Sequence, residues 1–155
     1  MAIELEILAP GDRPALLGLS SPDLLDYARG VLDQMGYKVH AASTHDEFLE
    51  RFGRVQYELV FIEDSFGGVL PEQNAALTTL QNMAMPLRRH ATVLLLSEVA
   101  QTLNPLQAFQ QSVHAIIHRA DMDKFMLLVQ QVVNDNLTFL GVYRDVQARL
   151  AQGKR

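Results

Sequence analysis

The chain alternates short apolar runs with longer segments in which apolar residues recur every three or four positions. Near-continuous apolar runs predict buried strands, and these cover Ala15–Leu19, Tyr37–Ala42, Tyr57–Glu63, Thr92–Leu96 and Val113–His118. The segments between them have helical periodicity, and strands that alternate with helices favour a parallel sheet with right-handed crossovers. We therefore expect a three-layer, doubly wound α/β domain of the flavodoxin-like type, with five strands in the order 2-1-3-4-5.

Capping and breaking residues predict where the helices begin and end. Ser21 followed by Pro22 begins the first helix, and Thr44 with Glu47 has the spacing of a capping box for the second. The other expected boundaries are helix ends at Gly36 and Gly53, helices over Pro71–Met85 and Pro105–Ser112, and a last helix from near Asp121 to about Ala151.

A length of 155 residues suits one domain, and no linker-like segment divides the chain. We expect an N-terminal arm at residues 1–14, the α/β domain at residues 15–134 and an extension of the last helix at residues 135–155.

Charge and composition exclude several classes of protein. The net charge of −5 argues against a nucleic-acid surface, which needs a concentrated basic patch. The absence of cysteine excludes disulfides and thiolate chemistry and fits a reducing compartment. No apolar run approaches the length of a membrane span, and Met1-Ala-Ile-Glu-Leu-Glu lacks the basic start of a signal peptide. These features predict a cytoplasmic protein that binds neither nucleic acid nor membrane.

Polar residues follow the predicted strands at their carboxyl ends, where an open α/β sheet forms its ligand crevice. They are Ser20 and Ser21 after the first strand, Glu63 and Asp64 at the third, Ser97 after the fourth and His118 at the end of the fifth.

These strands and their spacing resemble the receiver domain of two-component response regulators, over roughly Ala15 to Asn134. Glu58-Leu-Val-Phe-Ile-Glu63 is similar to that family's third strand, whose final Asp accepts a phosphoryl group. Thr92-Val-Leu-Leu-Leu-Ser97 is similar to the fourth strand, which ends in Ser or Thr, and Ala115-Ile-Ile-His118 to the fifth, which ends in Lys followed by Pro. The resemblance implies a response-regulator fold and a role in signal transduction.

The departures from the family pattern fall on the phosphorylation site. Ser20 and Ser21 stand where the family has two acids that hold Mg²⁺, Glu63 replaces the acceptor Asp, and His118 and Arg119 replace the Lys and Pro. Phosphoryl transfer to a carboxylate needs a divalent cation, acidic oxygen ligands and a balancing positive charge. We therefore expect a pseudo-receiver with no catalytic residue, metal or cofactor, which acts by protein–protein interaction without phosphorylation.

Several roles remain open for these residues. Glu63 either imitates a phosphorylated Asp or is an ordinary polar residue at a strand end. Ser97 either donates to Glu63 or caps the following loop, and His118 either pairs with Glu63 or has ordinary partners. Two alternative functions follow: a working phospho-acceptor that uses Asp64 or Glu63, and a small-anion or ligand site formed by the hydroxyls of Ser20, Ser21 and Ser97.

The last predicted helix continues past the point where the sheet can cover it. One stripe of residues recurs at alternating steps of four and three, the spacing of a heptad repeat. Its members are apolar except for Asn136: Phe125, Val129, Val132, Asn136, Phe139, Tyr143, Val146 and Leu150. The part from Asn136 to Leu150 predicts a protein-interaction helix and a homodimer, with Asn136 as a polar residue that fixes register. Alternatively, this part folds back on Ile3, Leu5 and Leu8 of the arm, and Gly141 marks a bend or a close helix crossing.

Overall fold

The structure is a computed structural model that describes residue 8 and residues 11–153, without the side chains of Leu140, Tyr143 and Arg144. Its centre is a five-stranded parallel sheet in the order β2-β1-β3-β4-β5, as predicted. The strands are β1 (Arg13–Gly18), β2 (Tyr37–Ala41), β3 (Leu59–Glu63), β4 (Thr92–Ser97) and β5 (Ala115–His118).

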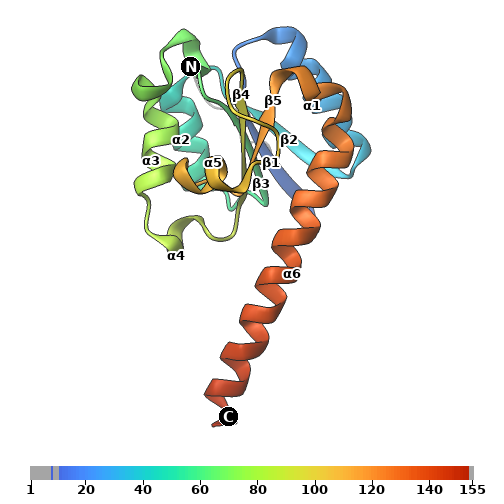
Figure 1. The fold of residues 1–155 in the computed structure, drawn as a ribbon, viewed down its shortest axis with the longest axis vertical. Helices are drawn as coiled ribbons and strands as arrows, with labels where there is room; N and C mark the ends of the chain where they lie inside the picture. Colours follow the sequence, from blue (N-terminus) through green and yellow to red (C-terminus); the bar gives the residue numbers. More distant parts are fainter. Residues whose placement is uncertain (1–7, 9–10, 154–155) are drawn as a thin grey trace.

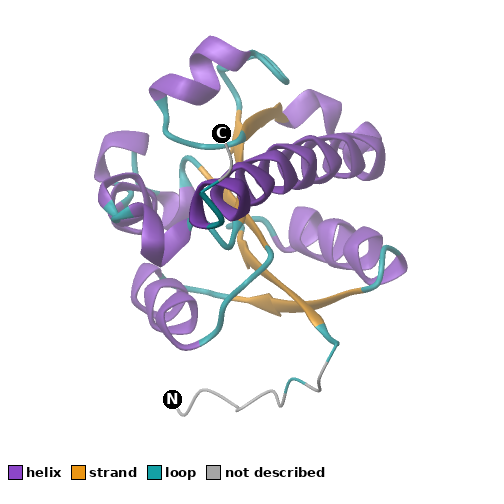
Figure 2. Ribbon diagram, turned by 90° about the horizontal axis from the view of Figure 1, so that it is seen from below, coloured by secondary structure: helices purple, strands orange, loops and turns teal. Residues whose placement is uncertain are grey.

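Helices cover both faces of this sheet (Figures 1 and 2). They are α1 (Pro22–Gln34), α2 (His45–Arg54), α3 (Ala75–Asn82), α4 (Met85–Arg88), α5 (Pro105–Gln110) and α6 (Phe125–Ala151). Short 3₁₀ helices η1 (Phe66–Gly68), η2 (Pro71–Gln73) and η3 (Arg119–Lys124) connect them. No helix in the described part of the chain has both the length and the apolar character needed to span a bilayer.

The alternation of side chains along the strands separates two apolar cores. One lies between the sheet and α1 with α6, and it includes Leu17, Phe61 and Phe125. The other lies between the sheet and α2, α3 and α5, and it includes Phe48 and Ile62. Both faces of β3 and β4 are therefore buried, which explains why these strands are apolar without interruption.

Several predicted boundaries are wrong, each for a local reason. The structure has η2, α3 and α4 where one helix was expected over Pro71–Met85. Asn74 ends η2 and caps α3. Met83 and Ala84 are extended, which separates α3 from α4. Gly53 does not stop α2, which reaches Arg54 and ends where Val55 becomes extended. The last helix begins with the 3₁₀ turn η3 before α6.

Helix α6 is continuous from Phe125 to Ala151 and runs out of the domain (Figure 1). Phe125, Val129 and Val132 are buried in the core. The Asn136 side chain donates a 2.8 Å hydrogen bond to Thr92 Oγ1 at the start of β4. Beyond that bond the described apolar residues of α6 are exposed, and we call residues 137–151 the tail. Of the arm residues named for a folded-back helix, Ile3 and Leu5 lie outside the described part of the chain.

Replacing Phe125 with Ala should lower the free energy of unfolding by about 3–5 kcal/mol, because the ring is fully buried and lies 4.9 Å from that of Phe61. The matched control is Phe109→Ala on α5, where the ring is 81% exposed and the change should stay within about 0.5 kcal/mol. Urea unfolding of both variants measures the difference. Equal effects would contradict this division between core and surface.

Candidate functional site

The candidate site is the crevice at the carboxyl ends of β1, β3, β4 and β5. All six residues singled out from the sequence lie on these strand ends or on the first residues after them: Ser20, Ser21, Glu63, Asp64, Ser97 and His118. Ser20 lies with Glu63, and Ser97 lies with Asp64, while Ser21 caps α1 and His118 bonds to the loop after β4 and to the turn after β5.

Glu63 is the buried carboxylate of the crevice, with 5% of its surface exposed. The backbone N–H of Ser20 donates to Oε1 at 2.9 Å, and the Ser65 hydroxyl donates to Oε2 at 3.3 Å. The guanidinium of Arg119 lies 3.6 Å from Oε2. Both carboxylate oxygens therefore have partners from this chain, as a buried charge requires.

Arg119 supplies the positive charge of the crevice. Its Nη1 lies 3.0 Å from Glu98 Oε1 as well as 3.6 Å from Glu63, so one guanidinium bridges two acids at neighbouring strand ends. In the sequence, Arg119 stands out only as the replacement for the family's Pro, and this role was not predicted. The available signal was a long cation directly after β5, since parallel strands end at one edge of the sheet.

His118 does not pair with Glu63. Its Nδ1 accepts a 3.0 Å hydrogen bond from the Ala120 N–H at the start of η3, so Nε2 carries the proton and donates to the carbonyl of Glu98 at 2.8 Å. The histidine thus joins the loop after β4 to the turn after β5 and leaves the ion pair with Glu63 to Arg119.

Asp64 is the carboxylate that meets Ser97. Burial raises the pKa of Asp64, hydrogen bonds from the Ser97 side chain and the Ser65 backbone lower it, and the charges of Glu63 and Glu98 raise it, with a net upward shift. The Ser97 oxygen also accepts from the N–H groups of Val99 and Ala100, at 3.2 and 3.1 Å, so this serine both caps the loop after β4 and contacts Asp64.

The hydroxyl oxygens of Ser20 and Ser21 both accept backbone hydrogen bonds. Ser21 caps α1 by accepting from the Leu24 N–H at 3.5 Å, and Ser20 Oγ accepts from the Gly67 N–H at 2.8 Å. Gly67 has φ of +79°, and a Cβ there would lie 2.9 Å from Nε2 of His45. The loop after β3 therefore lies over Ser20 in a conformation that favours glycine.

Asn74 and His45 hold this loop, and the sequence analysis did not single them out. The fully buried Asn74 donates to the carbonyls of Glu63 and Asp64, both at 2.9 Å, and caps α3 through the Leu77 N–H. His45 accepts from the Ala76 N–H and donates to the Phe66 carbonyl at 2.7 Å. An Asn before an apolar helical segment is a capping signal that would have identified Asn74.

The side chains of this crevice do not form a set of ligands for magnesium, which needs several free carboxylate or carbonyl oxygens. Gly18 pairs with Ile62, so the β1 residue level with Glu63 is Leu19, whose side chain is buried. The oxygens of Glu63 face a guanidinium and two hydrogen-bond donors. Among the residues that the structure describes, no three His, Asp or Glu side chains gather as a metal site would require.

Comparison with solved structures identifies the fold as that of CheY-like receiver domains. A receiver domain from Methanospirillum hungatei matches with a TM-score of 0.64 and 16% identity over 82% of this chain and 98% of the other. A response regulator from Burkholderia pseudomallei, solved with a phosphorylated aspartic acid, a calcium ion and citrate, matches with a TM-score of 0.60 and 17% identity over 92% and 86%.

NtrX from Brucella abortus also matches, with a TM-score of 0.67 and 16% identity over 86% of this chain, but the match spans only 29% of NtrX. No protein-family model matches the sequence, and no curated protein matches it. At these identities the comparisons establish the receiver fold, and the chemistry of the crevice has to be argued from its own residues.

Replacing Asp64 with Asn should stabilise the protein at pH 7, because burial and the neighbouring acids disfavour the ionised carboxylate in the folded state. The folded pKa lies above the unfolded one, so the stability of the unmodified protein falls as pH rises from about 3.8 through the folded pKa. The advantage of Asp64→Asn should accordingly shrink below about pH 4, where Asp64 is protonated.

Urea unfolding between pH 3.5 and pH 7.5 tests this expectation. Asp26→Asn, at an exposed position on α1, is the control and should change stability by no more than about 0.5 kcal/mol. A destabilised Asp64→Asn protein at pH 7 would show that the charge of Asp64 is favourable, contrary to the geometry.

Proposed function

We propose that this chain is a receiver-like signalling domain that acts by protein–protein contact without being phosphorylated, and that it associates with itself through the tail of α6. The observation that carries the first part is the set of partners around Glu63: Arg119, the Ser20 N–H and the Ser65 hydroxyl. No catalysis is required of such a domain.

The charges and hydrogen bonds around Glu63 and Asp64 disfavour phosphorylation of either residue. A phospho-acceptor carboxylate has to be free to attack, and a metal ion with acidic ligands has to neutralise the incoming phosphate. Glu63 instead lies against a guanidinium, and the neighbouring strand end presents Leu19 in place of an acid. Asp64, the other candidate acceptor, has Ser97 and a backbone N–H as partners and a raised pKa.

Glu63 fits the role of a permanent substitute for a phosphorylated aspartate. A carboxylate carries about one negative charge and a phosphoryl group nearly two, so Glu63 supplies part of the field of a phosphorylated residue. Arg119 joins that charge to Glu98 on the loop after β4 and holds the two neighbouring strand ends in one arrangement. We propose that the domain therefore presents one fixed surface to its partners.

Incubation with a small acyl phosphate and Mg²⁺ should leave the mass of the protein unchanged in intact-mass spectrometry, because Glu63 and Asp64 are engaged by other groups and the described residues form no cluster that would hold the cation. A receiver domain with an intact acidic site serves as positive control in the same reaction. A stable gain of one phosphoryl group would overturn the proposal, and Glu63→Gln and Asp64→Asn variants would then identify the acceptor.

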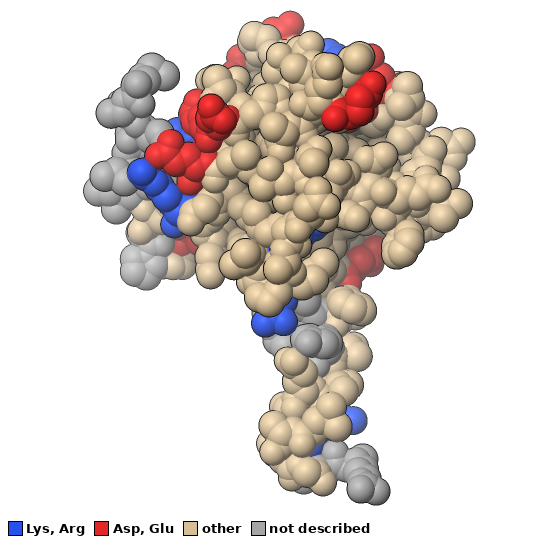
Figure 3. Space-filling model, turned by 90° about the vertical axis from the view of Figure 1, so that its left-hand side faces the viewer, with Lys and Arg blue, Asp and Glu red and all other residues tan. Residues whose placement is uncertain are grey.

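The proposal of self-association rests on the tail. Phe139, Val142, Val146 and Leu150 lie on one helical face and are 68, 62, 47 and 68% exposed. From the side of α3 and α4, the protruding helix shows mainly uncharged atoms (Figure 3). Burying about half of each side chain in two copies would contribute on the order of 6–12 kcal/mol. Association costs about 4–15 kcal/mol, so a weak to moderate dimer is expected.

Replacing Val146 with Glu should reduce self-association at least tenfold, because it places a charge in the centre of this apolar face. Ala148→Glu is the matched control: it adds the same charge at an exposed position on the opposite face of α6 and should change the dissociation constant less than threefold. Sedimentation over a concentration series measures both. Equal effects, or a chain that is monomeric at every concentration, would contradict tail-mediated association.

A further inference from the structure

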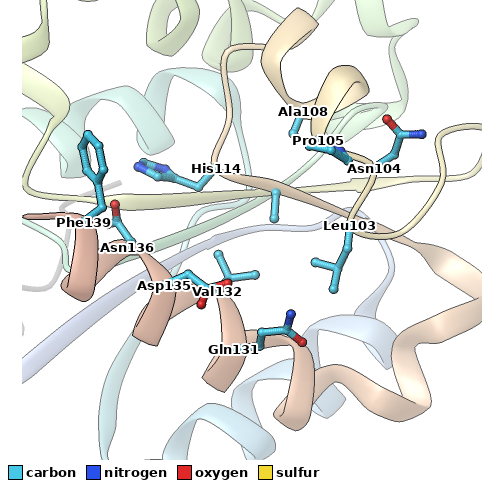
Figure 4. A pocket seen from close by; sticks show the side chains of 11 residues that line it. Leu103, Asn104, Pro105, Ala108, His114, Gln131, Val132, Asp135, Asn136 and Phe139 are labelled. Atoms are coloured by element: carbon cyan, nitrogen blue, oxygen red, sulfur yellow. The ribbon is translucent and has the colours of Figure 1, made fainter.

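A cavity lies where the tail leaves the domain, between α5 and α6 and beside the start of β5 (Figure 4). Its volume is about 390 Å³, and its lining includes Pro105 and Ala108 of α5, Ala115 of β5, and Asp135, Asn136 and Phe139 of α6. Phe139 belongs both to this lining and to the exposed face of the tail. Phe139 therefore connects the cavity, which lies between α5, β5 and α6, to the exposed apolar face of the tail.

The direction of the tail's apolar face follows from this shared residue. Phe139 faces the α5 side of α6, and Val142, Val146 and Leu150 follow it at steps of three, four and four, which keeps them on the same face. The apolar face of the tail therefore lies on the α5 side of α6. The end of a second helix packed along this face would contact the domain near α5 and the cavity.

The distribution of charge indicates which helix fits. Residues 137–155 contain four basic residues and one acid, Asp145, a net charge of +3; the whole chain carries −5, so residues 1–136 carry −8. Asp135 is the acid in the cavity lining, and among the described residues it has no ion-pair partner. The side chain of Arg149, near the end of the tail, is 66% exposed and forms an i,i+4 ion pair with Asp145 of its own helix.

We propose that two copies of the chain associate with their tails antiparallel, so that the end of each tail lies against the cavity at the base of the other. This inference rests on the proposed self-association and specifies its geometry. An antiparallel pair separates the basic ends of the two tails and brings each toward Asp135 at the base of its partner, whereas a parallel pair places the two basic ends together, away from both domains.

The length of the tail agrees with this arrangement. The exposed face from Phe139 to Leu150 is about 16 Å long, at 1.5 Å per residue. Full antiparallel overlap places Phe139 of one copy opposite Leu150 of the other and brings Ala151, the end of α6, to the level of Thr138, about 5 Å along the axis from Asp135. The underside of the partner domain then limits how far each tail can slide, which fixes the register without a polar residue at the interface. Asn136 itself bonds to Thr92 within its own domain, so it is not the residue that sets this register.

Disulfide trapping tests the orientation, since the chain has no cysteine of its own. Phe139→Cys alone and Leu150→Cys alone should form little covalent dimer under mild oxidation, while an equimolar mixture of the two should form it at least tenfold faster. Rapid cross-linking of Leu150→Cys with itself would show parallel tails and overturn the inference, although the self-association proposed above would stand. A monomeric unmodified chain would overturn both proposals.

Spin labels away from the apolar face provide a second measurement that keeps the interface intact. With antiparallel tails, labels at Asp145→Cys should lie close together in the dimer, while labels at Ala151→Cys should be about 20 Å apart along the helix axis. Parallel tails would give similar, short distances at both positions. Raising the salt concentration should also weaken the antiparallel dimer several-fold, and a dimer that strengthens with salt would contradict the charge argument.

Discussion

A buried carboxylate at the edge of the sheet is the constraint on which the crevice depends. Glu63 ends the most buried strand, and removing its charge from water is unfavourable unless partners replace the lost hydration. Three neighbouring segments contribute: the backbone after β1, the loop after β3 and Arg119 after β5. Because each partner comes from a different strand end, the charge of Glu63 ties together the loops that in a receiver fold surround the phosphorylation site.

The same requirement explains how the surrounding residues are arranged. Arg119 is partly exposed, so water hydrates part of its guanidinium, and Glu98 accepts from the same Nη1 that approaches Glu63. Ser20 approaches Glu63 with its backbone, so its hydroxyl is left to accept from Gly67 and to fix the loop after β3. The hydroxyl oxygens of Ser20, Ser21 and Ser97, from which the sequence suggested a ligand site, therefore accept hydrogen bonds from backbone N–H groups.

The sequence was sufficient for the architecture, because the apolar runs of β3 and β4 and the caps at Ser21 and Thr44 are local signals that agree with the final fold. It was insufficient for the crevice. Glu63 and Ser97 were placed correctly at their strand ends, but their partners come from residues distant in the chain. Glu63 and its partner Arg119 are 56 positions apart in the chain. Whether Ser97 contacts Glu63 or Asp64 depends on the direction in which each of these side chains points at the end of β3. No local pattern encodes those directions.

The continuity of α6 has a mechanical consequence. Phe125 and Val129 of α6 are buried in the core, and Asn136 is hydrogen-bonded to Thr92 of β4. Beyond Asn136 the helix extends about 22 Å without interruption. A rigid rod of that length acts as a lever: a tilt of about 5° at its root moves its free end by roughly 2 Å, given the same rise per residue. Small adjustments beside β4 and β5 would thus be magnified at the far end of the helix, where we propose that a second copy binds.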